Sequence, residues 1–287
     1  MEFVKMHGLG NDFVLFPPET EEIAEGKLPQ FAQRVCDRHF GVGGDGIILV
    51  LPSDRAEVKM RIFNSDGSEA EMCGNGVRCL AKFVYQRKLV SQKRFSVEAK
   101  GRIVTPEVKV EGDRVVSVTV DMGEPALAPE EVPVLISGDR AVNFPILIEN
   151  KNWLVTAVSM GNPHAVIFET PVNWRELGKI LENHPLFPQG TNVEFVRIIS
   201  PQEVEVKVWE RGAGATLACG TGACAVTVAG VINNLLTQKV TVHLPGGSLL
   251  VEWNREKNRV LMEGPAEEVF CGSIPEEVVH SWMLQPG

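Results

Sequence analysis

The chain has 287 residues, of which 44% are hydrophobic, and a formal net charge of −9. This acidic balance argues against binding to nucleic acid or to an anionic membrane, since both require a basic surface, and it leaves small solutes as the expected partners. The length favours two domains, because domains usually span about 100–150 residues.

The cysteines indicate a reducing compartment. Six cysteines in 287 residues are too few for a secreted protein held together by disulfides. No segment, the N-terminus included, has the apolar run that a signal peptide or a membrane helix needs. We therefore expect a cytoplasmic protein with reduced thiols. Structural zinc sites usually repeat C-x2–4-C pairs; here C-x5-C lies outside that range and C-x4-C lies at its limit, so no metal is expected.

Short segments with alternating apolar residues predict β-strands in the first half of the chain. The segment 58–62 is of this kind, and so is Arg114–Asp121, in which valines alternate with polar residues; the continuous apolar run 47–51 also predicts a strand. Between them, the apolar residues of 77–84 keep the i, i+3, i+4, i+7 spacing of a helix that starts at Gly76 or Val77.

The second half repeats this pattern after a Pro-rich stretch at 123–145, where two domains would join. Part of that stretch, 132–136, is predicted to be a strand. Alternating valines at 204–208 predict another strand, and Ala223–Leu236 is apolar on all sides, as in a buried helix. Each half is therefore expected to be a strand-rich shell around a central helix, an α/β (α+β) fold.

A long-period repeat relates the two halves. With the chain shifted by 146 positions, Cys73–Gly76 falls on Cys219–Gly222, and Phe63 falls on Trp209. The match extends outward at an offset of 151 for Gly10–Phe16 and of 140 for the residues near Met122. Self-similarity of this length indicates an ancient duplication that produced two similar, facing halves.

The repeated Cys-Gly-x-Gly motif suits acid–base chemistry on a carboxylate. At a helix N-terminus, unpaired N–H groups and the helix dipole stabilise anions, and a thiol pKa can fall from about 8.5 to about 3.5–7.5. The glycines let the backbone approach a ligand, so the same turn can hold a carboxylate. Two facing motifs would place one thiol on each side of a bound amino acid. One thiolate would remove the α-proton and the opposite thiol would deliver a proton, while N–H groups stabilise the carbanion.

The simplest alternative for a free cysteine is a small buried hydrophobe. The repeat argues against this interpretation for Cys73 and Cys219, because packing does not explain equal spacing from an aromatic-ended strand. We keep it for the remaining cysteines, which are Cys36, Cys79, Cys224 and Cys271.

Six motifs in order make the chain resemble the diaminopimelate epimerases, cofactor-independent enzymes of lysine and peptidoglycan precursor biosynthesis. The likeness spans nearly the whole chain. The motifs are His7–Phe13, Asp37–Gly46, Asn64–Cys79, Met160–Val166, Gly190–Phe195 and the segment from Glu210 to Cys224.

The resemblance implies a role for each matching residue. Cys73 and Cys219 would be the acid–base thiols, with His164 and Glu210 beside them as polar tuners. The reacting carboxylate would be held by the N–H groups of Gly74, Asn75, Gly220 and Thr221. The distal end of the substrate would be bound by Asn11, Asn64, Asn162, Asn192 and Arg211, and Glu210 would also contact the substrate.

The resemblance also implies a fold and partners. It places 1–120 and 267–287 in one half and 121–266 in the other, each a strand barrel about a central helix. No cofactor is expected. The chain would form a homodimer, close its domains on the substrate, and interconvert LL- and meso-diaminopimelate. Two departures stand out: Ala215 replaces a family glutamate, and Gly46 stands where some members have glutamine.

Rival interpretations are weaker. Gly41–Gly46 matches G-x-G-x-x-G, but it is followed by a strand rather than a helix, which excludes a dinucleotide fold. Proline racemases also use two thiols, but they carry histidine where this chain has Asn75, and they lack the segment Glu210–Gly212 that precedes the second cysteine. A redox-sensitive binding protein is the alternative from another class. If Cys73 and Cys219 approach within disulfide range, oxidation would close the site.

Overall fold

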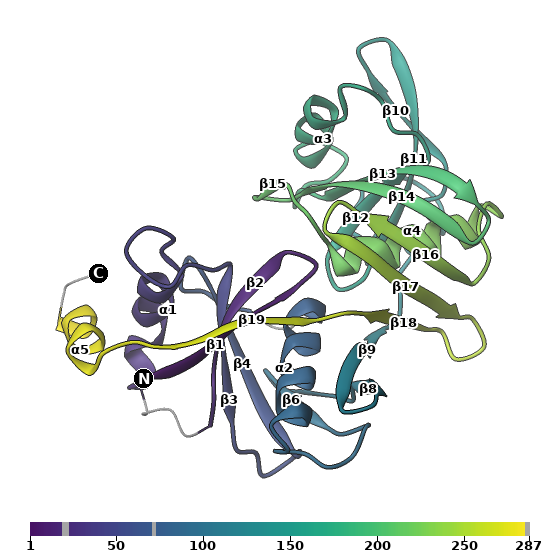
Figure 1. The fold of residues 1–287 in the computed structure, drawn as a ribbon. Coiled ribbons are helices and arrows are strands. Elements are labelled where there is room, and N and C mark those ends of the chain that lie inside the picture. The colour runs from purple at the N-terminus through teal and green to yellow at the C-terminus, as the bar shows by residue number, and fades with distance from the viewer. Residues whose placement is uncertain (19–22, 71–72, 285–287) are drawn as a thin grey trace. The chain divides into compact units, whose positions relative to one another are not determined.

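A computed structural model describes residues 1–18, 23–70 and 73–284. The chain forms two compact units, and each has strands and few helices (Figure 1). Unit 1 consists of Met1–Val120 and Gly264–Gly287, and unit 2 is Asp121–Glu263. The return to unit 1 thus begins at Gly264. In the described part of the chain, no helix is both long and apolar enough to cross a membrane.

The described part of unit 1 combines strands with three α-helices. Their bounds are β1 (Glu2–Gly8), β2 (Asn11–Phe16), a 3-10 turn η1 (Glu25–Lys27), α1 (Leu28–Cys36), β3 (Gly46–Leu51), β4 (Val58–Asn64), β5 (Glu69–Ala70), α2 (Gly74–Gln86), β6 (Val97–Ala99), β7 (Arg102–Val104), β8 (Glu107–Glu111), β9 (Arg114–Gly123), β19 (Glu267–Ser273) and α5 (Glu276–Leu284). Strand β9 runs three residues into unit 2.

Unit 2 repeats much of this order. Its elements are β10 (Phe144–Ile148), β11 (Lys151–Ser159), β12 (Pro163–Ile167), α3 (Trp174–Glu182), β13 (Asn192–Ser200), β14 (Glu203–Glu210), β15 (Gly214–Ala215), α4 (Gly220–Ile232), β16 (Lys239–Leu244), β17 (Gly247–Asn254) and β18 (Arg259–Gly264).

The strand pairing is the same in both units over their central strands, β1 to β6 in unit 1 and β11 to β16 in unit 2. Unit 1 has the order β19-β1-β2-β3-β4-β6-β7 with β5 on β4, and unit 2 has β10-β11-β12-β13-β14-β16-β17-β18 with β15 on β14. In each unit two pairs are parallel, namely β2/β3 and β4/β6, and β12/β13 and β14/β16. The offset of 146 holds within the ladder, because the pair Ile47↔Phe63 becomes Val193↔Trp209.

A helix lies inside the sheet of each unit. Helix α4 packs against β11, β12, β13, β16 and β17, so it is buried on nearly every side, as its uniformly apolar sequence predicts. Helix α2 packs against β1, β2, β3 and β8 and carries two buried cations, Arg78 and Lys82. Arg78 Nε donates to the carbonyl of Pro265, and Lys82 Nζ donates to that of Ala266. These bonds tie the returning C-terminal segment to unit 1.

The structure confirms the strands predicted at 47–51, 58–62, 114–121 and 204–208. The strand predicted at 132–136 is wrong, because this segment is turn and irregular chain. Val132 and Val134 are apolar because they pack into the core of unit 2, and not because they belong to a ladder.

Three smaller predictions also need correction. Helix α2 begins at Gly74, two residues before the earliest predicted start, and α4 ends at Ile232 rather than Leu236. Cys271 is exposed on β19, whereas we expected a buried cysteine. Its thiol donates to Glu268 Oε1 over 3.3 Å, so a polar partner holds it at the surface.

Candidate active site

Cys73 is the N-cap residue of α2, where the positive end of the helix dipole lies. Its backbone is extended, with φ −134° and ψ 114°, and turns into the helix at Gly74. The half-buried thiol lies 3.7 Å from Oδ1 of Asn11, the first residue of β2. The N–H groups of Gly74 and Asn75 belong to the first helical turn, which has no intrahelical acceptor for them and can therefore bind an anion.

Side-chain hydrogen bonds fix the surroundings of Cys73. Asn75 Nδ2 donates to Asn11 Oδ1 over 3.0 Å, and Asn75 Oδ1 accepts from Arg78 Nη2 over 2.7 Å. Asn11 Nδ2 in turn donates to Asp45 Oδ2 over 2.9 Å. Asn64, at the exposed end of β4, bonds instead to Ser68 Oγ over 3.0 Å. The structure thus brings Cys73, Asn11 and Asn75 together, with Asn64 held by a different partner.

Cys219 has the same place in unit 2 as Cys73 has in unit 1. It is the N-cap residue of α4, with φ −124° and ψ 109°, and is 5% exposed. Its Sγ accepts from the N–H of Gly222 over 3.3 Å and lies 3.4 Å from the hydroxyl of Thr221. A Cβ at Gly222 would lie 3.2 Å from this sulfur and 2.6 Å from Oε1 of Glu194, so a larger residue here would displace the Glu194 carboxyl group. Gly220 and Thr221 form the first turn of α4.

A buried polar network lies beside Cys219. His164 and Glu194 are both fully buried, and His164 Nδ1 lies 2.7 Å from Glu194 Oε1. His164 Nε2 lies 3.0 Å from Asn162 Oδ1, and Asn162 Nδ2 donates to Thr221 Oγ1 over 3.4 Å. Three of the residues selected from the sequence, His164, Asn162 and Thr221, are therefore brought together around this thiol.

Burial dominates the acid–base properties of Cys219 and Glu210. It raises the pKa of the Cys219 thiol well above the usual range, and the negative charges of Glu210 and Glu194 raise it further. Burial also raises the pKa of Glu210, which a hydrogen bond from Thr216 opposes. The lowered thiol pKa that a helix N-terminus favours is thus not found at Cys219, because its desolvation outweighs the helix dipole.

Asn192 and Arg211 adjoin each other at the end of β14. Asn192 is buried; its Oδ1 accepts from the backbone N–H of Arg211 over 3.0 Å, and its Nδ2 donates to the carbonyl of Pro163 over 2.9 Å. The exposed side chain of Arg211 donates from Nη1 to the carbonyl of Gln189 over 2.8 Å. Asn192 therefore sets the backbone at Arg211, while the guanidinium lies at the surface.

The two departures from the family pattern lie at different depths. Ala215 is exposed on β15. Gly46 is buried at the start of β3, and a Cβ there would lie 2.6 Å from the carbonyl oxygen of Phe63. A side chain at position 46 would therefore require the backbone to shift.

His164, Glu194 and Cys219 each offer an atom that can bind a metal, and these atoms all lie within 4.8 Å of one another. Two atoms bound about 2.0–2.2 Å from a tetrahedral zinc would be about 3.4 Å apart. The 2.7 Å between His164 Nδ1 and Glu194 Oε1 is instead a hydrogen-bond distance. We interpret the cluster as a hydrogen-bonded network.

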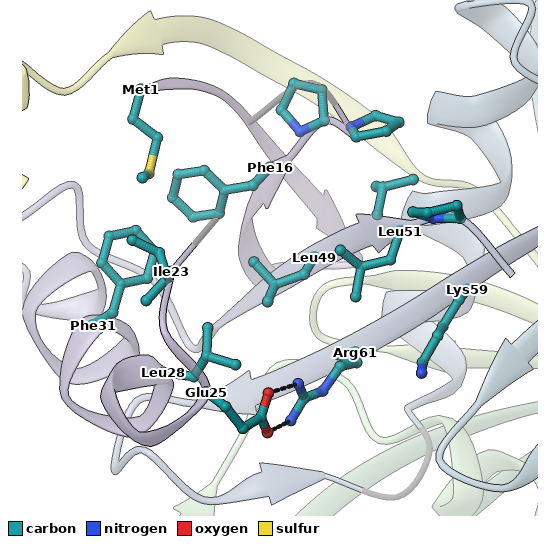
Figure 2. A pocket seen from close by; sticks show the side chains of 14 residues that line it. Met1, Phe16, Ile23, Glu25, Leu28, Phe31, Leu49, Leu51, Lys59 and Arg61 are labelled. Carbon is teal, nitrogen blue, oxygen red and sulfur yellow. Dashed lines mark hydrogen bonds and ion pairs between the residues drawn. The ribbon is translucent and has the colours of Figure 1, made fainter. Parts of the chain in front are cut away.

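A separate pocket of about 550 Å³ lies in unit 1 (Figure 2). Its wall is part apolar and part polar: Phe16, Phe31 and Leu49 are among the lining residues, and so are Arg61 and Glu25, which are paired over 2.7 Å. None of its lining residues is a site residue selected from the sequence. The pocket is therefore not part of the candidate site.

Sequence reasoning missed two buried charged residues, Arg78 and Glu194. Arg78 lies within the motif Asn64–Cys79 and Glu194 within Gly190–Phe195, but neither received a role. A signal was present in the repeat, because the offset of 146 aligns Glu194 with Ile48. A charge that replaces an apolar residue in a buried strand needs a partner, and this could have directed attention to it.

With this geometry established, comparison with known proteins gives the family. The model of the family "Diaminopimelate epimerase" matches residues 3–128 and 156–269. The chain belongs to the diaminopimelate epimerase family. A diaminopimelate epimerase from Desulfitobacterium hafniense is 54% identical over 97% of this chain and 100% of its own length. One from Moorella thermoacetica is 51% identical over 96% and 99%. As a member of the diaminopimelate epimerase family, the chain is an isomerase.

Solved structures share the fold of this diaminopimelate epimerase family member at low identity. A hydroxyproline epimerase from Agrobacterium vitis has a TM-score of 0.69 at 14% identity and covers 96% of this chain and 90% of its own. A Bacillus anthracis phenazine biosynthesis protein of the PhzF family has a TM-score of 0.68 at 12% identity, covering 96% and 99%. A probable proline racemase from Agrobacterium radiobacter has 0.68 at 13%, over 96% and 93%. Because its relatives at 50% identity and above are diaminopimelate epimerases, the proline racemase alternative is not favoured.

Proposed function

We propose that the chain interconverts LL- and meso-diaminopimelate without a cofactor, with Cys73 and Cys219 as the two acid–base groups. The observation that carries this proposal is the matched pair of helix N-caps, a cysteine with nearly identical backbone torsions before Gly74 in one unit and before Gly220 in the other. Each thiol lies at a helix end that favours anions, so either end can hold part of the substrate carboxylate.

The proton balance is closed by the two thiols alone. One cysteine, as thiolate, takes the α-proton and becomes a thiol, while the other, as thiol, donates its proton to the opposite face and becomes a thiolate. The raised pKa of Cys219 favours its thiol form before substrate binds. Each cysteine acts as acid in one direction of the reaction and as base in the other.

The remaining residues have three roles in this proposal. The N–H groups of Gly74, Asn75, Gly220 and Thr221 hold the reacting carboxylate. His164 and Glu210 tune Cys219, and Glu210 also contacts the substrate. The distal ammonium and carboxylate are bound by Asn11, Asn64, Asn162, Asn192 and Arg211. Side-chain amides can both donate to a carboxylate and accept from an ammonium, and Arg211 offers a bidentate fork.

The organisation of the chain is part of the proposal. Two halves of a duplicated fold, 1–120 with 267–287 and 121–266, would each supply one thiol. We further propose a homodimer in the cytoplasm, in keeping with the acidic composition and the free cysteines. Light scattering on the purified protein measures the first point, and a monomer at micromolar concentration would contradict it.

The test is a deuterium-exchange experiment. Reduced protein is incubated with LL-diaminopimelate in deuterated water, and α-deuterium incorporation and meso product are followed for the wild type, Cys73→Ala and Cys219→Ala. We expect exchange with epimerisation in the wild type and loss of epimerisation in both variants. Exchange with a proline-type acid alone would support a proline-type racemase. Absence of exchange with either substrate would support a protein that binds a ligand without catalysis.

A further inference from the structure

We infer that Glu194 is a positioning residue that sets the imidazole of His164 and, through Asn162 and Thr221, the hydrogen-bonding state of the Cys219 thiol. This inference rests on the proposed role of Cys219. It assigns a function to the only one of these five residues that the sequence left without one.

The contacts form a continuous chain within unit 2. Glu194 Oε1 lies 2.7 Å from His164 Nδ1, and His164 Nε2 lies 3.0 Å from Asn162 Oδ1. Asn162 Nδ2 lies 3.4 Å from Thr221 Oγ1, which lies 3.4 Å from Cys219 Sγ. Each link joins side-chain polar atoms, so a change at one end alters which atoms donate and accept at the other.

Donor and acceptor rules give the chain two states. Glu194 accepts from His164 Nδ1–H in both. When His164 is an imidazolium, Nε2–H donates to Asn162 Oδ1, the amide nitrogen donates to Thr221, and the Thr221 hydroxyl is left to donate to a Cys219 thiolate. When His164 is neutral, a half-turn of the Asn162 amide lets its nitrogen donate to Nε2. Thr221 then donates to Oδ1 and accepts from the Cys219 thiol.

The repeated fold shows that packing does not require this polar layer. At the equivalent positions of unit 1, Phe13 pairs with Gly46, and Ile48 follows two residues later, whereas in unit 2 His164 pairs with Asn192 and Glu194 follows. The second glycine of each Cys-Gly-x-Gly motif confirms the match in space. A Cβ on Gly76 would meet Ile48, and one on Gly222 would meet Glu194.

Burial makes the acidic residue costly. Glu194 is fully buried, and its second oxygen, Oε2, has no hydrogen-bond partner among the described residues. A buried carboxyl group with an unsatisfied oxygen lowers stability, and an apolar pair holds the same place in unit 1 without that loss. Glu210 of β14 is a further titratable group at this place. Its negative charge raises the pKa of Cys219, and the negative charge of Glu194 raises the pKa of Glu210. We conclude that the Glu194–His164 pair serves the chemistry of the Cys219 half.

The test compares Glu194→Gln, Glu194→Asp and a matched control, Glu203→Gln. The control removes another Glu–His contact of unit 2, the 2.8 Å bond between Glu203 and His243, which lies outside the chain of contacts. We expect Glu194→Gln to lower kcat about tenfold or more with little change in KM, Glu194→Asp to restore part of the loss, and the control to match the wild type.

Two further readouts separate positioning from mere packing. Nitrogen-15 NMR should show a changed protonation pattern of His164 in Glu194→Gln. The pH profile for alkylation of Cys219 by iodoacetamide, followed by peptide mass spectrometry, should shift while that of Cys73 stays unchanged. The inference would be overturned by a folded Glu194→Gln variant whose kcat stays within twofold of the wild type and whose pH profile for Cys219 alkylation does not shift.

Failure of the proposed function has a different signature. If Cys219→Ala retained epimerase activity, the assigned role of Cys219 would be wrong. The effect of Glu194 on His164 and on the alkylation of Cys219 would still be measurable, since neither readout needs turnover. Circular dichroism and thermal unfolding of each variant establish that it is folded.

Discussion

At the scale of single residues, the absence of a Cβ at Gly222 leaves room for the Cys219 thiol and the Glu194 carboxyl group. Gly222 is the tightest position of the second motif, since a Cβ there would lie 2.6 Å from Glu194 Oε1. We expect Gly222→Ala to displace the Glu194 carboxyl and the thiol, and to lower the free energy of unfolding by about 1–3 kcal/mol. Kinetics and denaturant unfolding measure both effects. Gly26→Ala, where no atom lies within 4 Å of the added Cβ, is the control and should change neither.

Asp12 gives the residue-scale prediction for pH. Burial alone would raise the pKa of Asp12, but hydrogen bonds from Arg38 and Lys5 outweigh it and lower the pKa from 3.8 to about 2. A lowered native pKa adds stability above the unfolded value, and this stability is lost as the pH falls from about 4 to about 2.

Partial solvent exposure reduces this contribution to about 1–2 kcal/mol. We therefore expect the free energy of unfolding of the wild type to fall between pH 5 and pH 2, and this part of the decrease to be absent in Asp12→Asn. Urea unfolding at several pH values measures it. Equal slopes for wild type and variant would show that Asp12 is not stabilised in this way.

At the scale of elements, α2 does more than present Cys73. Its buried Arg78 and Lys82 bind the carbonyls of Pro265 and Ala266 and so hold the returning strand in unit 1. Replacing Arg78 by methionine leaves Asn75 and the Pro265 carbonyl without this donor. We expect the free energy of unfolding to fall by about 2–4 kcal/mol.

Arg87→Met, at the C-cap of the same helix, is the matched control. Arg87 is exposed and pairs with Glu268 of the same returning strand, and exposed ion pairs contribute about 0–1 kcal/mol. Chemical denaturation of both variants distinguishes a buried tie from a surface one. Similar losses for Arg78→Met and Arg87→Met would count against the proposed anchoring.

Strands in a ladder could be predicted from the apolar pattern of the sequence, whereas a loop with apolar residues could not be told from a strand. Segments with period-two apolar residues in a ladder, such as 58–62 and 204–208, were predicted correctly because alternation reports one buried face. The segment 132–136 also has apolar residues, but its Leu135 N–H bonds to the carbonyl of Leu186, far along the chain. Local periodicity carries no information about such a partner.

At the scale of the whole molecule, oxidation tests whether the two thiols act on one substrate. If Cys73 and Cys219 approach within disulfide range, with Cα atoms about 4.4–6.8 Å apart, oxidation joins them and stops turnover. We expect activity to be lost with oxidant and restored by reductant, and mass spectrometry to find the Cys73–Cys219 crosslink.

The exposed Cys271 complicates this assay, because it can oxidise between molecules. The measurement is therefore best made in Cys271→Ser, which should keep full activity when reduced, since Cys271 lies on β19 outside the candidate site. If neither oxidant nor reductant changed the activity, the predicted inactivation by a Cys73–Cys219 disulfide would be wrong.

The sequence by itself determined the repeat, the family and the position of both cysteines, because glycine-rich motifs and their spacing are local and are copied in both halves. Only the tertiary structure decided that Cys219 is desolvated, with its pKa raised, and that Glu194 lies against His164. The physical reason is that burial and charge depend on which strands lie side by side. His164 and Glu194 are thirty positions apart in the chain, and the parallel pairing of β12 with β13 brings them into contact.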